Sequence, residues 1–94
     1  MSNQFLEALT FAESLAIRKE DFQAQVKDWE RRRGAYESEL EALKNGTPVS
    51  SSHYEALETR FKELNEEKEL LMEEEAAINA DVKRYQEMRA EVEA

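Results

Sequence analysis

The stretch "KNGTPVSSSH", residues 44–53, is the only clear break in this sequence, and it lies at the midpoint of the 94-residue chain. Asn45 and Gly46 tolerate the left-handed backbone conformation in which helices commonly end, and Lys44 is a favourable charge at a helix C-terminus. The stretch therefore predicts the end of one helix and raises a question. It is either a spacer between helices that diverge or a hinge on which one helix folds back along the other.

Two signals for the start of a second helix compete within this break. Thr47 before Pro48 resembles an N-cap followed by the first helical position. Ser52, with Glu55 three residues later, has the spacing of a capping box. The sequence therefore predicts a second helix and leaves its first residue open by several positions.

The composition on both sides of the break is that of long helices. Hydrophobic residues make up 40% and charged residues 37%, with two Gly and one Pro, which favours a coiled coil over a sheet. A chain of this length forms one domain with a thin core. The absence of cysteine excludes a disulfide framework.

Each half of the chain carries one apolar stripe at alternating steps of three and four residues, the spacing of a heptad repeat. Ten of twelve positions are apolar in the first half, counted from Phe5, and nine of twelve in the second half, counted from Tyr54. Position a holds Phe5, Ala12, Lys19, Val26, Arg33, Leu40, Tyr54, Phe61, Lys68, Glu75, Val82 and Arg89. Position d holds Ala8, Leu15, Phe22, Trp29, Tyr36, Leu43, Leu57, Leu64, Leu71, Ile78, Tyr85 and Val92.

The flanking g positions select a fold-back register, because g faces g in an antiparallel pair. Pairing Leu43 with Tyr54 brings together Glu39 and Arg60, Arg32 and Glu67, Gln25 and Glu74, Arg18 and Asp81, and Phe11 and Met88. None of these pairs repels, whereas a slide of one heptad opposes like charges. We therefore predict an all-α fold, an antiparallel coiled-coil hairpin with helices over about 4–44 and 52–92, a hinge over about 45–51, and one domain over 1–94.

The polar residues at position a are expected to lie with their stems over the seam and their charged heads in solvent. One of them, Lys68, is expected opposite Trp29, where an ammonium group could contact the ring face.

Catalytic and metal-binding signals are weak. His53 lies beside Ser50, Ser51 and Ser52, but a turn of capping residues explains all four without chemistry. No phosphate loop, glycine fingerprint or metal-ligand spacing occurs in the sequence. We expect no enzymatic activity, catalytic residue, cofactor, metal or small-molecule substrate.

The charge and the N-terminal stretch narrow the choice of partners. A formal charge of −9 disfavours direct binding to nucleic acid, which attracts basic surfaces. Glu7 and Glu13 interrupt the apolar N-terminal stretch, which therefore matches neither a signal peptide nor a membrane span. We expect a cytoplasmic protein whose partner is another protein or a second copy.

Apolar residues that the stripe does not use point to a surface for that partner. Position e carries glutamates near the hinge but Leu9, Ala16, Gln23, Met72, Asn79 and Gln86 towards the free ends. This flank implies that another helix or hairpin covers it, either a second copy in a four-helix bundle or a foreign protein. The candidate partner-binding residues are Phe5, Leu6, Leu9, Phe11, Ile17, Met72 and Met88.

The function that we expect is a protein–protein interaction module, such as an adaptor, assembly chaperone, scaffold or small inhibitor, acting through apolar surface at the open end of the hairpin. The alternative is an acidic mimic of nucleic acid that inhibits a nucleic-acid-binding protein. Its face would comprise Glu63, Glu66, Glu67, Glu69, Glu73 and Glu74.

Overall fold

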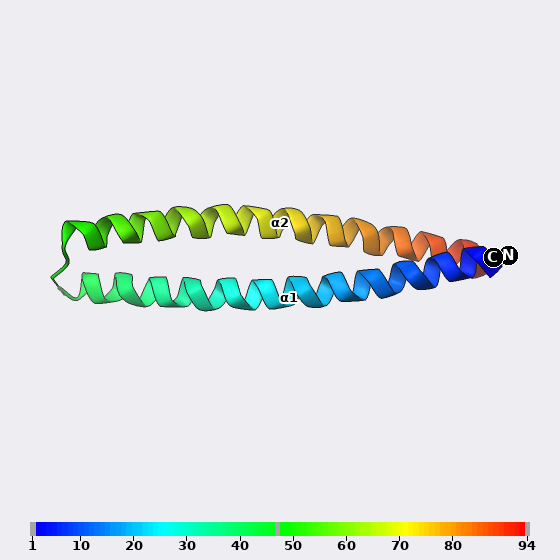
Figure 1. The fold of residues 1–94 in the computed structure, drawn as a ribbon, viewed down its shortest axis with the longest axis horizontal. Coiled ribbons are helices and arrows are strands. Elements are labelled where there is room, and N and C mark those ends of the chain that lie inside the picture. Colours follow the sequence, from blue (N-terminus) through cyan, green and yellow to red (C-terminus); the bar gives the residue numbers. More distant parts are fainter. Residues whose placement is uncertain (1, 47, 94) are drawn as a thin grey trace. The chain divides into compact units, whose positions relative to one another are not determined.

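The computed structural model describes residues 2–46 and 48–93, and these residues form two long helices. Helix α1 spans Ser2–Lys44 and helix α2 spans Ser51–Glu93 (Figure 1). The described part of the chain contains no strand. The predicted all-α class and helical hairpin are confirmed.

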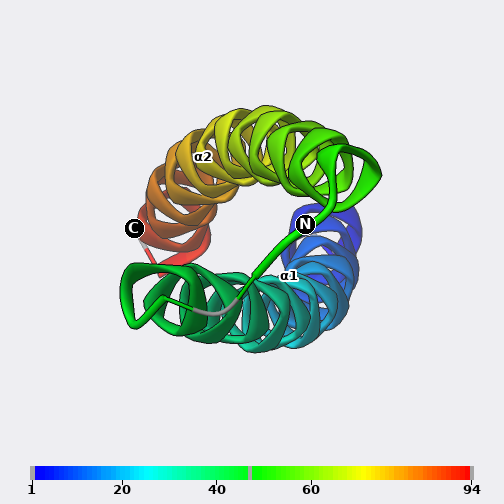
Figure 2. The same ribbon diagram turned by 90° about the vertical axis from the view of Figure 1, so that its left-hand side faces the viewer.

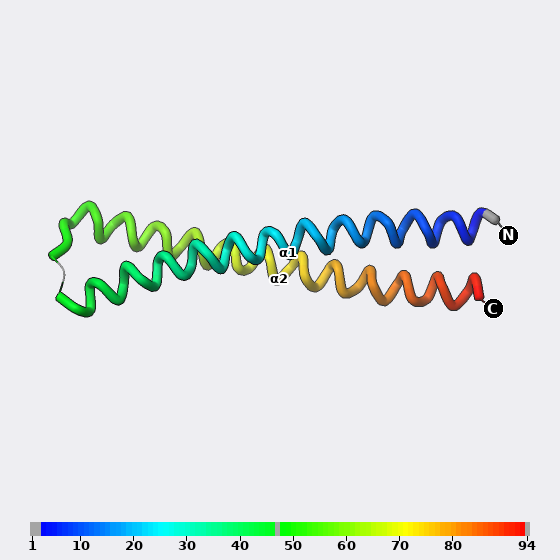
Figure 3. Tube along the Cα trace, turned by 90° about the horizontal axis from the view of Figure 1, so that it is seen from below, coloured from blue at the N-terminus to red at the C-terminus, as the bar shows by residue number. Residues whose placement is uncertain are grey.

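The chain divides into two compact units, each of which contains part of both helices. Unit 1 comprises residues 1–24 and 72–94, and unit 2 comprises residues 25–71. In unit 1 the first turns of α1 and the last turns of α2 lie at the same end, blue and red in Figure 3. In unit 2 the end of α1 is joined to the start of α2. The helices are antiparallel within each unit.

Helix α1 ends at the residues that the sequence predicts. The Asn45 amide donates a hydrogen bond to the Glu41 carbonyl at 3.1 Å, and the Gly46 amide donates to the Leu43 carbonyl at 3.0 Å. Gly46 has a φ of 87°, in the left-handed region where a side chain would be strained. Residues 48–50 lead into α2, as the view onto this end in Figure 2 shows.

Helix α2 is capped by Ser50. Its hydroxyl oxygen accepts a hydrogen bond from the His53 amide at 3.2 Å, and its carbonyl accepts one from the Tyr54 amide at 3.1 Å. This is the N-cap arrangement, in which the side chain satisfies a donor of the first turn. Ser52 already lies inside the helix, so it is not the cap that the capping-box spacing suggested. Thr47, the other candidate, lies outside the described residues.

Position d forms the core of both units. The most buried side chains are Ala8, Leu15 and Ile78 in unit 1 and Leu57 and Leu64 in unit 2, and all five occupy d. The other seven d residues are half-buried. Position a is far more exposed than position d. Its residues Phe5, Tyr54 and Phe61 remain more than half exposed.

The packing face is therefore centred on d and not midway between a and d as the heptad assignment implied. Nine of the ten g residues that the register pairs are half-buried, whereas every described e residue from Leu9 to Glu93 is exposed. Five of the twelve a positions carry Lys, Arg or Glu, while no d position is charged. Because those charged heads need water, each helix turns its g flank inward and its a and e side outward.

Ion pairs along the g flank confirm the predicted register within each unit. In unit 2, Arg32 Nη1 lies 2.6 Å from Glu67 Oε2, and Arg60 Nη1 lies 2.7 Å from Glu39 Oε1. In unit 1, Arg18 donates to Asp81. These hydrogen bonds raise the pKa of the Arg18 and Arg32 guanidinium groups, with Asp81 and Glu67 respectively as the largest cause.

The contacts of the aromatic residues in unit 2 include one that the register predicts and one that differs from the expectation. Tyr36 and Phe61, which share a predicted layer, have ring centroids 6.0 Å apart. Trp29 Nε1 donates to the Leu64 carbonyl oxygen at 2.9 Å. The cation over the Trp29 ring is Arg33 of the same helix, 5.4 Å from the centroid, so the expectation of Lys68 in that place is wrong. Arg33 is four residues from Trp29 and lies on the same helix face.

Two leucines of α2 should differ strongly in their contribution to the free energy of unfolding. Leu64 is 7% exposed and Leu70 is 64% exposed. Leu64→Ala should lower the free energy of unfolding by about 2–4 kcal/mol, because it removes buried methyl groups and leaves a cavity. Leu70→Ala should change it by less than about 0.5 kcal/mol in the same urea titration. Equal effects would contradict the assignment of Leu64 to the core.

The register predicts rescue between Arg32 and Glu67. Either Arg32→Glu or Glu67→Arg alone should lower the melting temperature by a few degrees, since the pair is partly exposed and worth about 0.5 kcal/mol. The double reversal should recover much of the loss. Arg31 provides the control, because it pairs with Asp28 of its own helix. Arg31→Glu combined with Glu67→Arg should show no rescue.

Candidate interaction surface

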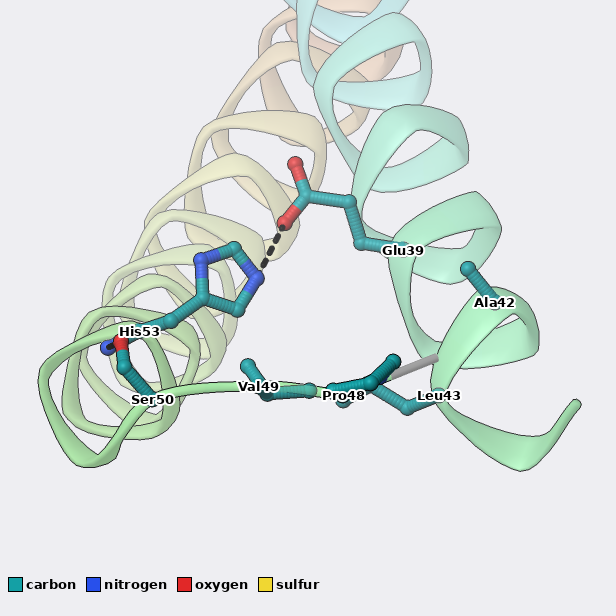
Figure 4. A pocket seen from close by; sticks show the side chains of 7 residues that line it. All are labelled: Glu39, Ala42, Leu43, Pro48, Val49, Ser50 and His53. Carbon is teal, nitrogen blue, oxygen red and sulfur yellow. Dashed lines mark hydrogen bonds and ion pairs between the residues drawn. The ribbon is translucent and has the colours of Figure 1, made fainter. Parts of the chain in front are cut away.

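The hinge of unit 2 contains a shallow depression of about 360 Å³. Figure 4 shows His53 directed towards Glu39 across it. His53 Nε2 lies 3.8 Å from Glu39 Oε2, beyond hydrogen-bond distance, while the other oxygen of Glu39 accepts from Arg60. The Ser50 hydroxyl is engaged by the His53 backbone amide and lies 3.2 Å from the Ser52 hydroxyl. Ser50 thus acts as a helix cap, and its hydroxyl contacts lie within the turn itself.

Across residues 2–46 and 48–93, no three His, Asp or Glu side chains gather in a way that could hold a metal ion. Within the same ranges, neither helix has a stretch long and apolar enough to cross a membrane.

A second depression, of about 560 Å³, lies on unit 1 and gathers three of the predicted partner-binding residues: Leu6, Phe11 and Met88. The Arg84 guanidinium lies over the Phe11 ring, 5.6 Å from its centroid. Phe11 is half-buried, more than its position outside the stripe led us to expect. The inward turn of the g flank and the cover by Arg84 explain the difference.

Arg84 is the residue of this surface that the sequence reasoning missed. Phe11 and Met88 were predicted to face each other, and Arg84 is one helical turn before Met88 on α2. Because residues four apart lie on the same helix face, this spacing predicts that Arg84 lies near Met88 and Phe11.

The other side of unit 1 is an open flank, made by positions a and e of both helices. Since the g residues of α1 and α2 meet in ion pairs, the e residues of both helices share the opposite side. We call this surface the open flank of unit 1; it comprises Phe5, Leu9, Ala12, Ala16, Lys19, Gln23, Met72, Glu75, Asn79, Val82, Gln86, Arg89 and Glu93.

The structure thus divides the seven predicted partner-binding residues into three groups. Leu6, Phe11 and Met88 line the depression, Phe5, Leu9 and Met72 lie on the open flank, and Ile17 is at the outward position f. Five of the seven are strongly exposed: Phe5 58%, Leu6 55%, Leu9 47%, Ile17 60% and Met72 62%.

The six glutamates of the alternative acidic face are not equally free. Glu67 is bound by Arg32 at 2.6 Å, and Glu74 lies 3.4 Å from Arg18. The other four, Glu63, Glu66, Glu69 and Glu73, are exposed. Two of the six carboxylates therefore serve the helix pairing within their own units.

Comparisons with protein-family models, with curated proteins and with solved structures gave no match to this chain.

The different surroundings of Phe11 and Leu9 predict different costs of replacement. Phe11→Ser should lower the free energy of unfolding by about 1–2 kcal/mol, because it removes a half-buried ring together with its contact with Arg84. Leu9→Ser should cost less than about 0.5 kcal/mol in a chain that is monomeric under the conditions used. Thermal and urea unfolding, followed by circular dichroism at low concentration, measure both. A Leu9→Ser cost equal to that of Phe11→Ser would show that Leu9 belongs to the core.

Proposed function

We propose that this chain is a non-enzymatic protein–protein interaction module whose working surface is the exposed apolar part of unit 1. The carrying observation is the mismatch between its small core and its exposed apolar side chains. Among the described residues of unit 1, only Ala8, Leu15 and Ile78 are nearly inaccessible, while five large apolar residues remain about half exposed or more.

Exposed apolar side chains cost free energy in water. Proteins carry clusters of them mainly where another surface covers them. Each of these side chains would contribute about 1.5–3 kcal/mol to an interface that buried it fully. Adaptors, assembly chaperones, scaffolds and small inhibitors all work through such an interface, and the proposal covers this class as a whole. We place the protein in the cytoplasm as part of the same proposal.

The acidic mimic of nucleic acid is the second candidate. Four exposed glutamates support it, and the arginine pairing of Glu67 and Glu74 weakens it. The two candidates differ in salt dependence, because contacts between charges are screened and apolar contacts are not.

The test uses the tagged chain to capture its partner from a native lysate of the source cells at low and high salt. Leu6→Ser combined with Leu9→Ser removes one exposed leucine from each apolar side of unit 1. This variant should remain helical and lose the captured protein, and capture by the wild type should change little between about 50 and 500 mM salt.

A charge variant provides the matched control. Glu63, Glu66, Glu69 and Glu73 are replaced by Gln, which keeps their size and their exposed helical positions. This variant should capture as the wild type does. Loss of capture by the Gln variant, with retention by the leucine variant, would instead establish the acidic face as the working surface.

A further inference from the structure

The two sides of unit 1 differ in how completely the helix pair closes them. On the g side, Arg18 bridges to Asp81 and Glu74, and Arg84 covers Phe11. On the open flank, Phe5 and Leu9 follow each other by one helical turn and remain 58% and 47% exposed. The open flank therefore lacks the covering that the other side has.

The open flank also differs in charge from the rest of unit 1. Unit 1 contains eleven Asp and Glu residues and five Lys and Arg residues, a formal charge of −6. The open flank carries two cations, Lys19 and Arg89, and two carboxylates, Glu75 and Glu93, so its own formal charge is zero. The net negative charge of unit 1 is therefore carried entirely by residues outside the open flank.

On the strength of this charge distribution, we propose that the open flank of unit 1 binds a second copy of itself, so that two chains form a dimer. The inference rests on the proposed function and names the partner. A basic foreign protein would be attracted to the acidic faces and not to this one. Two copies that met through the acidic faces of unit 1 would bring like charges together, whereas the neutral flank lets them approach without that repulsion.

The side chains of the open flank suit pairing with themselves. It presents both signs of charge: Arg89 already pairs with Glu93 of its own helix at 2.9 Å, and a two-fold arrangement can oppose Lys19 of one copy to Glu75 of the other. It also combines large side chains, Phe5, Leu9 and Met72, with the small residues Ala12 and Ala16. Small residues provide the holes into which large ones pack when helices associate, and two hairpins that pack in this way form a four-helix bundle.

The experiment measures the mass of the purified full chain over a wide concentration range by sedimentation equilibrium. The wild type should reach twice the mass of the 11.0 kDa chain. Leu9→Ser should weaken dimerisation by at least about tenfold, because each dimer loses two buried leucines. Leu6→Ser is the matched control, since Leu6 is similarly exposed on the same helix but lines the depression on the other side. It should change the dimerisation constant by less than about threefold.

Met72→Ser keeps the proposal testable if Leu9→Ser lowers helicity. Met72 lies on the open flank but belongs to α2. The Met72→Ser variant should also weaken dimerisation. A wild type that stays monomeric at all concentrations, an assembly other than a dimer, or equal weakening by Leu6→Ser and Leu9→Ser would each overturn the proposal. A monomeric wild type that still captured a foreign protein through its leucines would refute the dimer and leave the interaction module standing.

Discussion

The packing of the d residues is the interaction on which the rest of this structure depends. Leu57 and Leu64 in unit 2, and Leu15 and Ile78 in unit 1, supply most of the nearly inaccessible apolar surface. Among the described residues each helix has only the other helix to pack against, so a single row of side chains must hold it. The ion pairs of the g flank add little free energy because they are partly exposed. Their contribution is to fix the register in which the d residues meet.

The constraint that shapes the surface is the set of charged residues at position a. Lys19, Glu75 and Arg89 in unit 1 would lose their hydration if position a faced the partner helix fully. The pair instead centres on d and draws the g side inward, where Arg18 and Asp81 neutralise each other. This rotation leaves Phe5 and Leu9 exposed together with the charged heads. The surface proposed to bind a partner is therefore a direct consequence of how the core avoids burying charge.

Much of this could be predicted from the sequence. The apolar spacing predicted the helices, the opposite charges at g predicted the pairs Arg32 with Glu67 and Arg60 with Glu39, and Gly46 predicted the end of α1. The rotation about the helix axes was missed, because the assignment treated positions a and d as equivalent. The signal was present: every d residue is apolar and five a residues are charged. Two side-chain contacts could not have been inferred from spacing, namely the Trp29 hydrogen bond to Leu64 and the choice of Ser50 as the cap, because both depend on local geometry.

The inward turn of the g flank is tested most directly by the solvent accessibility of two methionine methyl groups in unit 1. Met72 is on the open flank and 62% exposed, whereas Met88 is at position g and half-buried. Methyl-labelled methionine and a soluble paramagnetic probe report this accessibility by nuclear magnetic resonance, with signals assigned by substitution. In a dilute, monomeric sample the inward turn of the g flank predicts stronger relaxation of the Met72 methyl than of the Met88 methyl. Equal relaxation, or stronger relaxation at Met88, would contradict the inward turn of the g flank.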